Sequence, residues 1–417
     1  MKRLLAGILM LAATACSGGQ GPASLVSAPG MPWRPVTTGM AKADPVELVA
    51  NHPDSAAARL RLLNVQIEAQ DKAGALASLA WLTAHGHVFS AGGQRQLAKL
   101  AADWGQPDPG LIAKAAERSA SVAFGEVPVA AQLVEAVAFD RRRGRLFATT
   151  VVSRQLWVRD SAGRWSAVAL AGVDSLSGMV IDPARGVLWV ASGNLGMGPG
   201  PQNAFRGLIA IDLATLREMA RIAAPDGVNP SDIALGVKGT LYASDPIGGG
   251  VYRARVGETA LTQLIAPGTL RSPQGLAESA DGRLLYVSDY GYGLAAIMLD
   301  QRRVLRLGAG TALPIPLDGI DGLWRQGNSL IAVQNGTSPQ RIVRLTLTNG
   351  GLAILRAAVL EQANPAWTEP TSGSLDGNRL LYVATGQWDR FDNGAPLPGK
   401  PVQPTQVRLL QLRTTNH

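Results

Sequence analysis

Cysteine and histidine are nearly absent from this chain of 417 residues. It has one cysteine, Cys16, so no disulfide can form within the chain. Its four histidines include none between residue 88 and His417. A Ser-His-Asp triad, a histidine-dyad lactonase and a histidine-assisted sugar dehydrogenase all need a histidine beside the reacting atoms. The sequence therefore excludes these chemistries from most of the chain.

Charge is also scarce. Only 17% of the residues are charged, and although the net charge is +8, the basic residues are scattered. No basic helix and no basic stripe interleaved with aromatic residues is present, which excludes a nucleic-acid partner. Apolar residues make up 46% of the chain, enough for a large core, and its 48 glycines and 26 prolines favour a turn-rich β protein.

The first sixteen residues have the pattern of an export signal. Residues 1–3 include a lysine and an arginine, and residues 4–11 form an apolar run, too short for a bilayer that needs about 20 residues. Small residues precede the cysteine, and this resembles the lipobox of bacterial lipoproteins. The resemblance implies a signal peptide over residues 1–15, a lipidated Cys16 and a tether over residues 16–42.

The same segment predicts the compartment. Ser17 is not the aspartate that resembles an inner-membrane retention signal, so we expect an outer-membrane lipoprotein that faces the periplasm and is attached by its lipid alone. Ala13, Thr14 and Ala15 also fit an ordinary A-x-A cleavage site. A soluble periplasmic or secreted protein is therefore the alternative.

Residues 43–120 predict a small helical domain. Asp44, Pro45 and Glu47 have the pattern of a helix start, and apolar residues recur at helical spacing in the helices expected from about residue 53 and from Asp71. The pair over residues 53–86, with "AQDKAGALASLAWL", resembles a tetratricopeptide hairpin. A last helix is expected after residue 108. The domain is either a cap or spacer, or a surface that binds a protein partner.

From about residue 130 to 413 the sequence repeats six times. Each segment has an apolar strand, a tight turn with glycine and a second strand, as in "EAVAFDRRRGRLFATT" and "QGLAESADGRLLYVSD". The turn glycines are Gly144, Gly186, Gly239, Gly282, Gly327 and Gly377, separated by 42 to 53 residues. This period predicts four-stranded blades and a mainly β fold, a six-bladed β-propeller. An open β-solenoid is the competing architecture.

A propeller brings the first residues of its innermost strands together at one mouth of the central tunnel. These positions are Glu135, Ser177, Ser231, Gln274, Asp321 and Thr371, with Asp232 and Glu369 beside them. Glu135 and Asp321 lie on nearby blades, and two carboxylates at about 5 Å repel by about 3 kcal/mol. Either one carboxylate is protonated or a cation lies between them. Oxygen ligands of this kind suit Ca²⁺, Mg²⁺ or Mn²⁺.

The repeats resemble the SMP-30/gluconolactonase family of six-bladed propellers. The similarity is carried by "EAVAFDRRRGRLF", "SDIALGVKGTLYASD", "SPQGLAESADGRLLYVSDYG" and "IDGLWRQGNSLIAVQNG", and covers residues 130–412. It implies a divalent cation, with calcium the first candidate, held by Glu135, Gln274 and Asp321, and a substrate contact at Ser231. Gln274 and Ser231 depart from the family pattern, which has asparagine at both positions.

The resemblance implies hydrolysis of a small lactone or ester, with the cation polarising the carbonyl and Asp321 or Asp232 as the base. Ser177 and Trp388 are further candidates for substrate contacts. The structural alternatives are a turn for Asp321, a rim charge for Glu135, a loop contact for Gln274, a strand cap for Asp232 and blade packing for Trp388. Asn335, in a glycosylation-like sequon, is interpreted as a turn residue.

A second functional class also fits the sequence. The two departures from the family pattern and the additional helices are consistent with a non-catalytic propeller lipoprotein that binds a protein partner. Binding of a small molecule without turnover is a third alternative.

Overall fold

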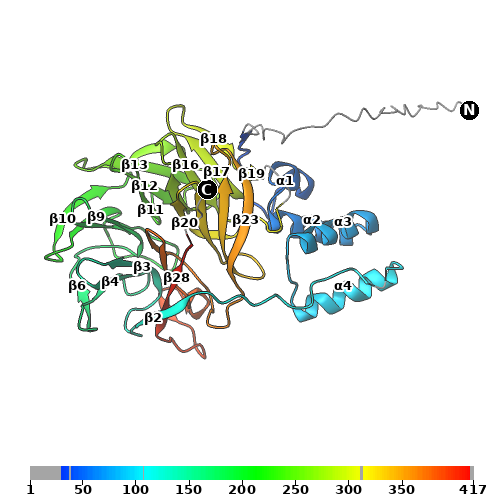
Figure 1. The fold of residues 1–417 in the computed structure, drawn as a ribbon, viewed down its shortest axis with the longest axis horizontal. Helices are drawn as coiled ribbons and strands as arrows, with labels where there is room; N and C mark the ends of the chain where they lie inside the picture. The colour runs from blue at the N-terminus through cyan, green and yellow to red at the C-terminus, as the bar shows by residue number, and fades with distance from the viewer. Residues whose placement is uncertain (1–29, 37–38, 107, 310–312, 414–417) are drawn as a thin grey trace, which may run out of the picture.

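The computed structural model describes residues 30–36, 39–106, 108–309 and 313–413. Most of the chain forms six β-sheets arranged as the blades of a propeller around a central tunnel (Figure 1). The innermost strand of each blade contacts that of the next blade, and the strand of the sixth blade contacts that of the first. The ring is therefore closed, which confirms the six-bladed β-propeller and rules out an open solenoid.

The strands of each blade are antiparallel and run in chain order from the tunnel outward in blades one to five. Blade one contains β3 (Val134–Asp140), β4 (Arg145–Thr150), β5 (Leu156–Arg159) and β6 (Trp165–Val168). Blade two contains β7 (Leu176–Asp182), β8 (Val187–Ser192), β9 (Gly207–Asp212) and β10 (Glu218–Ala223). Blade three contains β11 (Ile233–Leu235), β12 (Thr240–Asp245), β13 (Gly250–Arg255) and β14 (Thr262–Ile265).

Blades four and five each carry an additional short strand. Blade four contains β15 (Pro273–Glu278), β16 (Leu284–Asp289), β17 (Gly293–Met298), β18 (Arg303–Arg306) and, at its outer edge, β1 (Met31–Pro32). Blade five contains β20 (Ile320–Gln326), β21 (Ser329–Gln334), β22 (Arg341–Leu347), β23 (Ala353–Gln362) and β19 (Gly308–Ala309). Only the pairing of β19 with β23 is parallel among these described strands.

Blade six closes the ring with two distant parts of the chain. It contains β24 (Gly373–Asp376), β25 (Arg379–Val383), β28 (Thr405–Gln411) and β2 (Val122–Val127). A small hairpin of β26 (Phe391–Asp392) and β27 (Ala395–Pro396) lies between β25 and β28 in sequence. Because β2 pairs with β28, the propeller begins at Val122 and not near residue 130 as the repeats suggest.

Tight turns and apolar strands explain why these segments form blades. All six repeat glycines have a positive φ, between 58° and 76°, which glycine adopts without a steric penalty. The apolar side chains of neighbouring blades pack together, as Phe147 of blade one does with Leu188 of blade two. Both are fully buried. The core of the molecule therefore lies between the blades and not within a single sheet.

Four helices form a separate layer at one side of the propeller (Figure 1). They are α1 (Pro45–Asn51), α2 (Ala56–Glu68), α3 (Lys72–Ala84) and α4 (Ala91–Asp103). Asp44 caps α1 by accepting from the backbone N–H groups of Val46 and Glu47. The expected last helix after residue 108 is wrong, because residues 108–121 contain no helical turn.

The segment expected to be a free tether is partly structured. Cys16 and the predicted signal lie outside the described residues, but β1 pairs with β18 and adds an edge strand to blade four. Trp33 is 8% exposed, and its indole N–H donates to the carbonyl of Thr269 at 3.0 Å. In the described part of the chain, no helix has the length and apolar character needed to cross a bilayer.

The helical layer is fixed to the propeller by polar contacts. Asp318, in the loop before β20, accepts from the backbone N–H groups of Ala56 and Ala57 at 2.9 and 2.8 Å. It therefore acts as a cap for α2 from another part of the chain. Ser55 donates to the carbonyl of Gly291 at 2.9 Å, and Ser338 donates to that of Val88 at 2.6 Å. The helices thus rest on the loops at one end of blades four and five.

Candidate active site

A β-bulge occurs near the start of four innermost strands. The register shifts between Val134 and Val137 in β3, and in the same place in β7, β15 and β20. Glu135, Gln274 and Asp321 each lie within such a bulge. A bulge redirects a side chain away from the regular alternation of the strand, and bulges recur beside active sites. This irregularity places the predicted residues at the end of the tunnel.

Close approach of a neighbouring blade explains the glycine that follows Gln274, and the ring of Trp324 in the same strand explains the one that follows Asp321. A Cβ atom on Gly275 would lie 2.6 Å from the carbonyl oxygen of Asp321, and one on Gly322 would lie 2.3 Å from the ring of Trp324. Asp321 and Gly322 lie within β20, so the interpretation of this dipeptide as a turn is wrong. The residue with a positive φ near this point is Gly319, with a φ of +66°.

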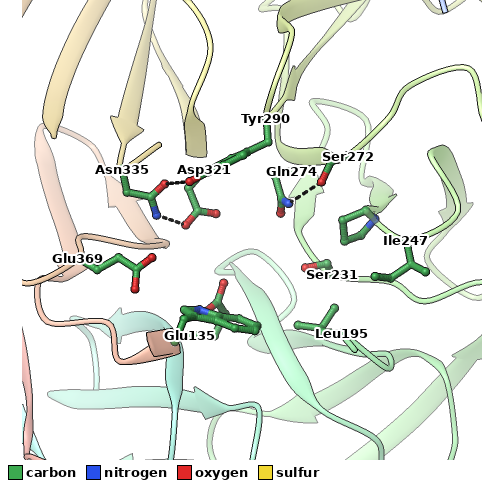
Figure 2. Close-up of a pocket in the computed structure, with 12 residues that line it drawn as sticks. Glu135, Leu195, Ser231, Ile247, Ser272, Gln274, Tyr290, Asp321, Asn335 and Glu369 are labelled. Atoms are coloured by element: carbon green, nitrogen blue, oxygen red, sulfur yellow. Dashed lines mark hydrogen bonds between the residues drawn. The ribbon is translucent and has the colours of Figure 1, made fainter. Parts of the chain in front are cut away.

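The predicted mouth encloses a cavity of about 280 Å³ (Figure 2). Its lining combines acids, neutral polar groups and apolar side chains, and the full set is Glu135, Leu195, Ser231, Pro246, Ile247, Ser272, Gln274, Tyr290, Asp321, Asn335, Glu369 and Trp388. We call this end of the tunnel the acidic mouth. No lysine, arginine or histidine is among these described lining residues.

Glu135 is held by blade six. Trp388, in the 3₁₀ helix Trp388–Arg390, donates its indole N–H to Oε2 of Glu135 at 2.8 Å. Thr371 donates to the backbone carbonyl of Glu135 at 2.9 Å. Glu135 is 8% exposed, so its interpretation as a solvated rim charge is wrong. Trp388 lines the cavity and orients a carboxylate, in addition to its packing against apolar neighbours.

Asp321 is held by a chain of neutral donors. Asn335 donates its amide N–H to Oδ2 of Asp321 at 2.8 Å, and Tyr290 donates its hydroxyl to Oδ1 of Asn335 at 2.8 Å (Figure 2). Asn335 follows β21, and Tyr290 follows β16. Because the first two strands of a blade are antiparallel, the end of the second lies beside the start of the first. Sequence reasoning missed both residues.

Burial and mutual repulsion raise the pKa values of the acids. Burial, followed by the charge of Asp321, raises the pKa of Glu135 well above its usual value. Burial, followed by the charge of Asp232, raises the pKa of Asp321 to about 7. Asp321 is partly exposed to water, but most of its surroundings are protein. This environment disfavours the charged carboxylate and therefore raises its pKa. Burial also raises the pKa of Glu369.

The other predicted residues do not all line the cavity. Ser231 and Gln274 line the cavity, and the amide of Gln274 donates to Ser272 at 3.2 Å. Asp232 is not a lining residue. It accepts from the backbone N–H of Ile233 at 3.0 Å, as expected of a cap, and burial raises its pKa to about 7.

Ser177 is fully buried and does not line the cavity. Its hydroxyl donates to the carbonyl of Ser231 at 2.8 Å and links blades two and three. This hydrogen bond uses the hydroxyl to join two blades in the wall of the tunnel. Ser177 is therefore not placed to contact a substrate in the cavity.

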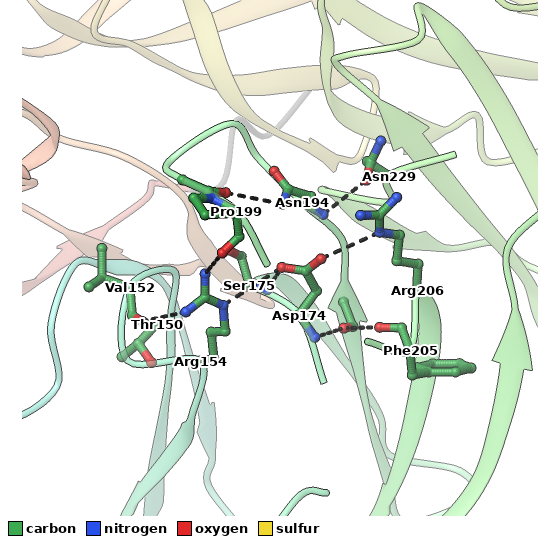
Figure 3. A network of polar contacts seen from close by, with 12 residues as sticks. Thr150, Val152, Arg154, Asp174, Ser175, Asn194, Pro199, Phe205, Arg206 and Asn229 are labelled. Atoms are coloured by element: carbon green, nitrogen blue, oxygen red, sulfur yellow. Dashed lines mark hydrogen bonds and ion pairs between the residues drawn. The ribbon is translucent and has the colours of Figure 1, made fainter. Parts of the chain in front are cut away.

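The loop over residues 193–206 forms the apolar side of the mouth and supplies Leu195. Asp174, fully buried, lies 3.4 Å from the guanidinium of Arg206 and 3.7 Å from that of Arg154 (Figure 3). Arg154 also donates to the carbonyl of Pro199 at 3.3 Å. These contacts join the loop to blades one and two, so Leu195 has a fixed position beside the acids.

The donor chemistry of the acidic mouth fits a hard divalent cation. Glu135 and Asp321 offer carboxylate oxygens and Gln274 an amide oxygen, which are ligand types that Ca²⁺ and Mg²⁺ prefer. Within the described ranges, no three His, Cys, Asp or Glu side chains are grouped to hold a metal ion. Amide and water oxygens would therefore complete the coordination of a cation at this place.

Comparisons with known proteins find distant structural likenesses and no family. No family model and no curated protein matches the chain. A gluconolactonase from Xanthomonas campestris is 15% identical, with a TM-score of 0.45, covering 71% of this chain and 96% of its own. The calcium-binding protein regucalcin from Agrobacterium tumefaciens is 18% identical, with a TM-score of 0.46, covering 70% and 96%.

Enzymes of different chemistry are found at the same level of similarity. A catalytically inactive virginiamycin B lyase from Staphylococcus aureus is 15% identical, with a TM-score of 0.45, covering 67% of this chain and 80% of its own. Likenesses this distant assign no activity. The function must be argued from the residues of the acidic mouth.

Proposed function

We propose that this protein is a divalent-cation-dependent hydrolase of lactones or esters that acts at the acidic mouth. The observation that carries the proposal is the convergence of Glu135 and Asp321 on one cavity that has no basic lining residue. Two buried acids without a positive neighbour are costly unless a proton or a cation compensates them. Glu135, Gln274 and Asp321 would hold the cation, with calcium first and magnesium or manganese as alternatives.

A bound cation supplies polarisation of the acyl carbonyl and acidification of a water molecule. The protein supplies the rest. Asp321 lines the cavity, and its carboxylate would accept the proton of the attacking water. Its hydrogen bond from Asn335 fixes the carboxylate for proton transfer. Water adds to the carbonyl carbon as the acyl C–O bond breaks, giving a hydroxy acid from a lactone.

Asp232 and the neutral polar residues have supporting roles in this scheme. Asp232 lies outside the lining, and its charge raises the pKa of Asp321. Ser231 and Trp388 line the cavity and are positioned to contact the substrate.

The test is a hydrolysis assay on purified protein with a panel of lactones and aryl esters. Activity should disappear with a chelator and return with calcium, manganese or magnesium. Glu135→Gln should abolish the metal response, whereas Glu126→Gln, at an exposed strand edge, should keep it. Absence of turnover with every metal would refute the hydrolase.

The proposal places this activity at the bacterial envelope, through a lipid on Cys16. Labelling of growing cells with a palmitate analogue should mark the wild-type chain and leave Cys16→Ala unmarked. Release of both forms into the soluble fraction would instead support a soluble periplasmic or secreted protein.

A non-catalytic binding protein is the second candidate. The observation that favours it is the helical layer, which rests on the loops of the acidic mouth and leaves Val46 and Val65 exposed by 66% and 40%. Crosslinking in cells, followed by purification, should recover a stoichiometric partner in that case. A monomer with lactone turnover would contradict this second candidate.

A further inference from the structure

The cavity at the acidic mouth has two unlike sides. Asp321, Asn335 and Glu369 lie on one side, and Leu195 and Ile247 lie on the other (Figure 2). Pro246, next to Ile247, also lines the cavity. Ser231 and Ser272 lie on the same side (Figure 2). A ligand whose reacting group lies at the acids would therefore place its remaining atoms mainly against Leu195, Pro246 and Ile247.

Ile247 is held in a tight turn between β12 and β13. Asp245 accepts from the backbone N–H groups of Ile247 and Gly248 at 3.2 and 2.9 Å. The side chain of Ile247 is 54% exposed, so it has apolar area free for contact. A fixed turn presents this area without the entropy cost of ordering a mobile loop on binding.

Leu195 is presented from the opposite loop in a similarly fixed way. Asn194 donates its backbone N–H to Oδ1 of Asn229 at 3.0 Å, and Gly196 donates to Oδ1 of Asn194 at 2.8 Å. The ion pairs of Asp174 hold the remainder of this loop (Figure 3). Two independent loops thus place apolar side chains at one edge of the cavity.

Several polar groups of the acidic mouth are paired with one another. Asn335 bonds to Asp321, Tyr290 to Asn335, Trp388 to Glu135 and Gln274 to Ser272. A carboxylate or phosphate substituent would meet three lining acids and no basic lining residue.

We infer that the acidic mouth selects neutral lactones or esters that carry an apolar side chain. This inference rests on the proposed hydrolase function and adds the substrate class. The ester group lies at the acids, and the alkyl or aryl substituent packs between Leu195 and Ile247. Burial of a few methylene groups there gives the selectivity.

The experiment compares three δ-lactones with the same ring: unsubstituted δ-valerolactone, δ-decanolactone with a pentyl chain, and polyhydroxylated glucono-δ-lactone. We expect kcat/KM for δ-decanolactone to exceed the other two by about tenfold or more. Ile247→Asn should reduce this preference by about tenfold. Met219→Asn, at a side chain 58% exposed on the outer strand β10, should keep it. Equal use of the three lactones, or preference for glucono-δ-lactone, overturns the inference.

Binding separates this inference from the hydrolase itself. The lactams piperidin-2-one and 6-pentylpiperidin-2-one resist hydrolysis and are titrated by calorimetry with calcium present. Tighter binding of the pentyl lactam by about tenfold or more, lost in Ile247→Asn, supports the apolar side even if no lactone is turned over. Equal binding of the two lactams, or binding of neither, overturns it even if hydrolysis is found.

Discussion

The two mouths of the tunnel are built from the same inner strands, yet their charges are arranged differently. The strand starts form the acidic mouth, with Glu135 and Asp321. The strand ends form a wider cavity of about 610 Å³, which we call the wide mouth. There Asp140 pairs with Arg143 at 3.0 Å, and Asp376 pairs with Arg141 at 3.4 Å.

The two mouths differ in how their charged side chains are paired. At the wide mouth, Asp140 and Asp376 are each paired with a guanidinium group, whereas Glu278 accepts from Tyr242 and from the backbone N–H of Val237. At the acidic mouth, the partners of the carboxylates are a neutral indole and a neutral amide. The rotational symmetry of a propeller relates its blades and not its two ends, and here four β-bulges lie near the strand starts. Neutral partners at Glu135 and Asp321 further distinguish the acidic mouth from the two ion pairs of the wide mouth.

The largest effect is expected from neutralising one acid at the acidic mouth. Asp321→Asn preserves the shape and an acceptor for Asn335 but removes the charge and the base. We expect kcat/KM for lactones to fall by about 10²–10³-fold. Asp376→Asn, at the wide mouth, should leave the rate within about twofold. Similar rates for both variants would remove the functional distinction between the mouths.

Cation binding should be confined to the same end. Calcium at 100 times its dissociation constant stabilises a folded protein by about 2.7 kcal/mol, so Tm should rise by several degrees. Glu135→Gln should abolish this shift in differential scanning fluorimetry, and Asp376→Asn should keep it. A shift retained in Glu135→Gln would place the cation elsewhere.

The buried charge of Asp232 should lower stability at high pH. Burial raises its folded pKa to about 7 from an ordinary value of 3.8, so the folded state binds more protons between these values. Stability from this group falls as pH rises through that window, and the loss is complete above pH 7. Asp232→Asn should therefore stabilise the protein on the order of 2 kcal/mol at pH 8 and very little below pH 4.

Urea unfolding in the presence of a chelator measures this effect at both pH values. Asp376→Asn is the matched control, because that side chain is half exposed and paired with Arg141. A destabilised Asp232→Asn at pH 8 would show that its hydrogen bond to Ile233 outweighs the cost of its burial.

The smallest effect concerns the helical layer, which rests on blades four and five. Asp318→Asn replaces Oδ2, which accepts from Ala57 and Ser55, with an amide donor. Relief of a buried charge offsets part of the loss, so we expect a net destabilisation of about 1 kcal/mol by urea unfolding. A more stable variant would show that the cap on α2 does not hold the helices in place.

Much of the ring could be predicted from the sequence because its repeats are regular. Six glycine turns predict the six blades, and closure of the ring predicts that Glu135, Gln274 and Asp321 lie at one cavity. Tyr290 and Asn335 were missed because they follow second strands, where the expected feature was only a turn. Because the first two strands of a blade are antiparallel, the residue after the second strand lies at the mouth. The repeats in the sequence therefore allow this position to be predicted.

The apolar side of the cavity and the outer boundaries of the propeller could not be predicted from the repeats. Leu195 reaches the mouth through a long loop whose path depends on contacts of Asp174 with two arginines. The pairing of β2 with β28 joins segments almost 280 residues apart, which no local pattern encodes. Ser177 has the predicted position in its repeat, but its hydroxyl donates a hydrogen bond to the carbonyl of Ser231.

That pairing of β2 with β28 has a consequence for biosynthesis. Blade six is incomplete until residues 405–411 have left the ribosome, because β28 is the strand that joins β25 to β2. A premature stop codon before residue 405 would therefore remove the strand that ties the start of the propeller to its end.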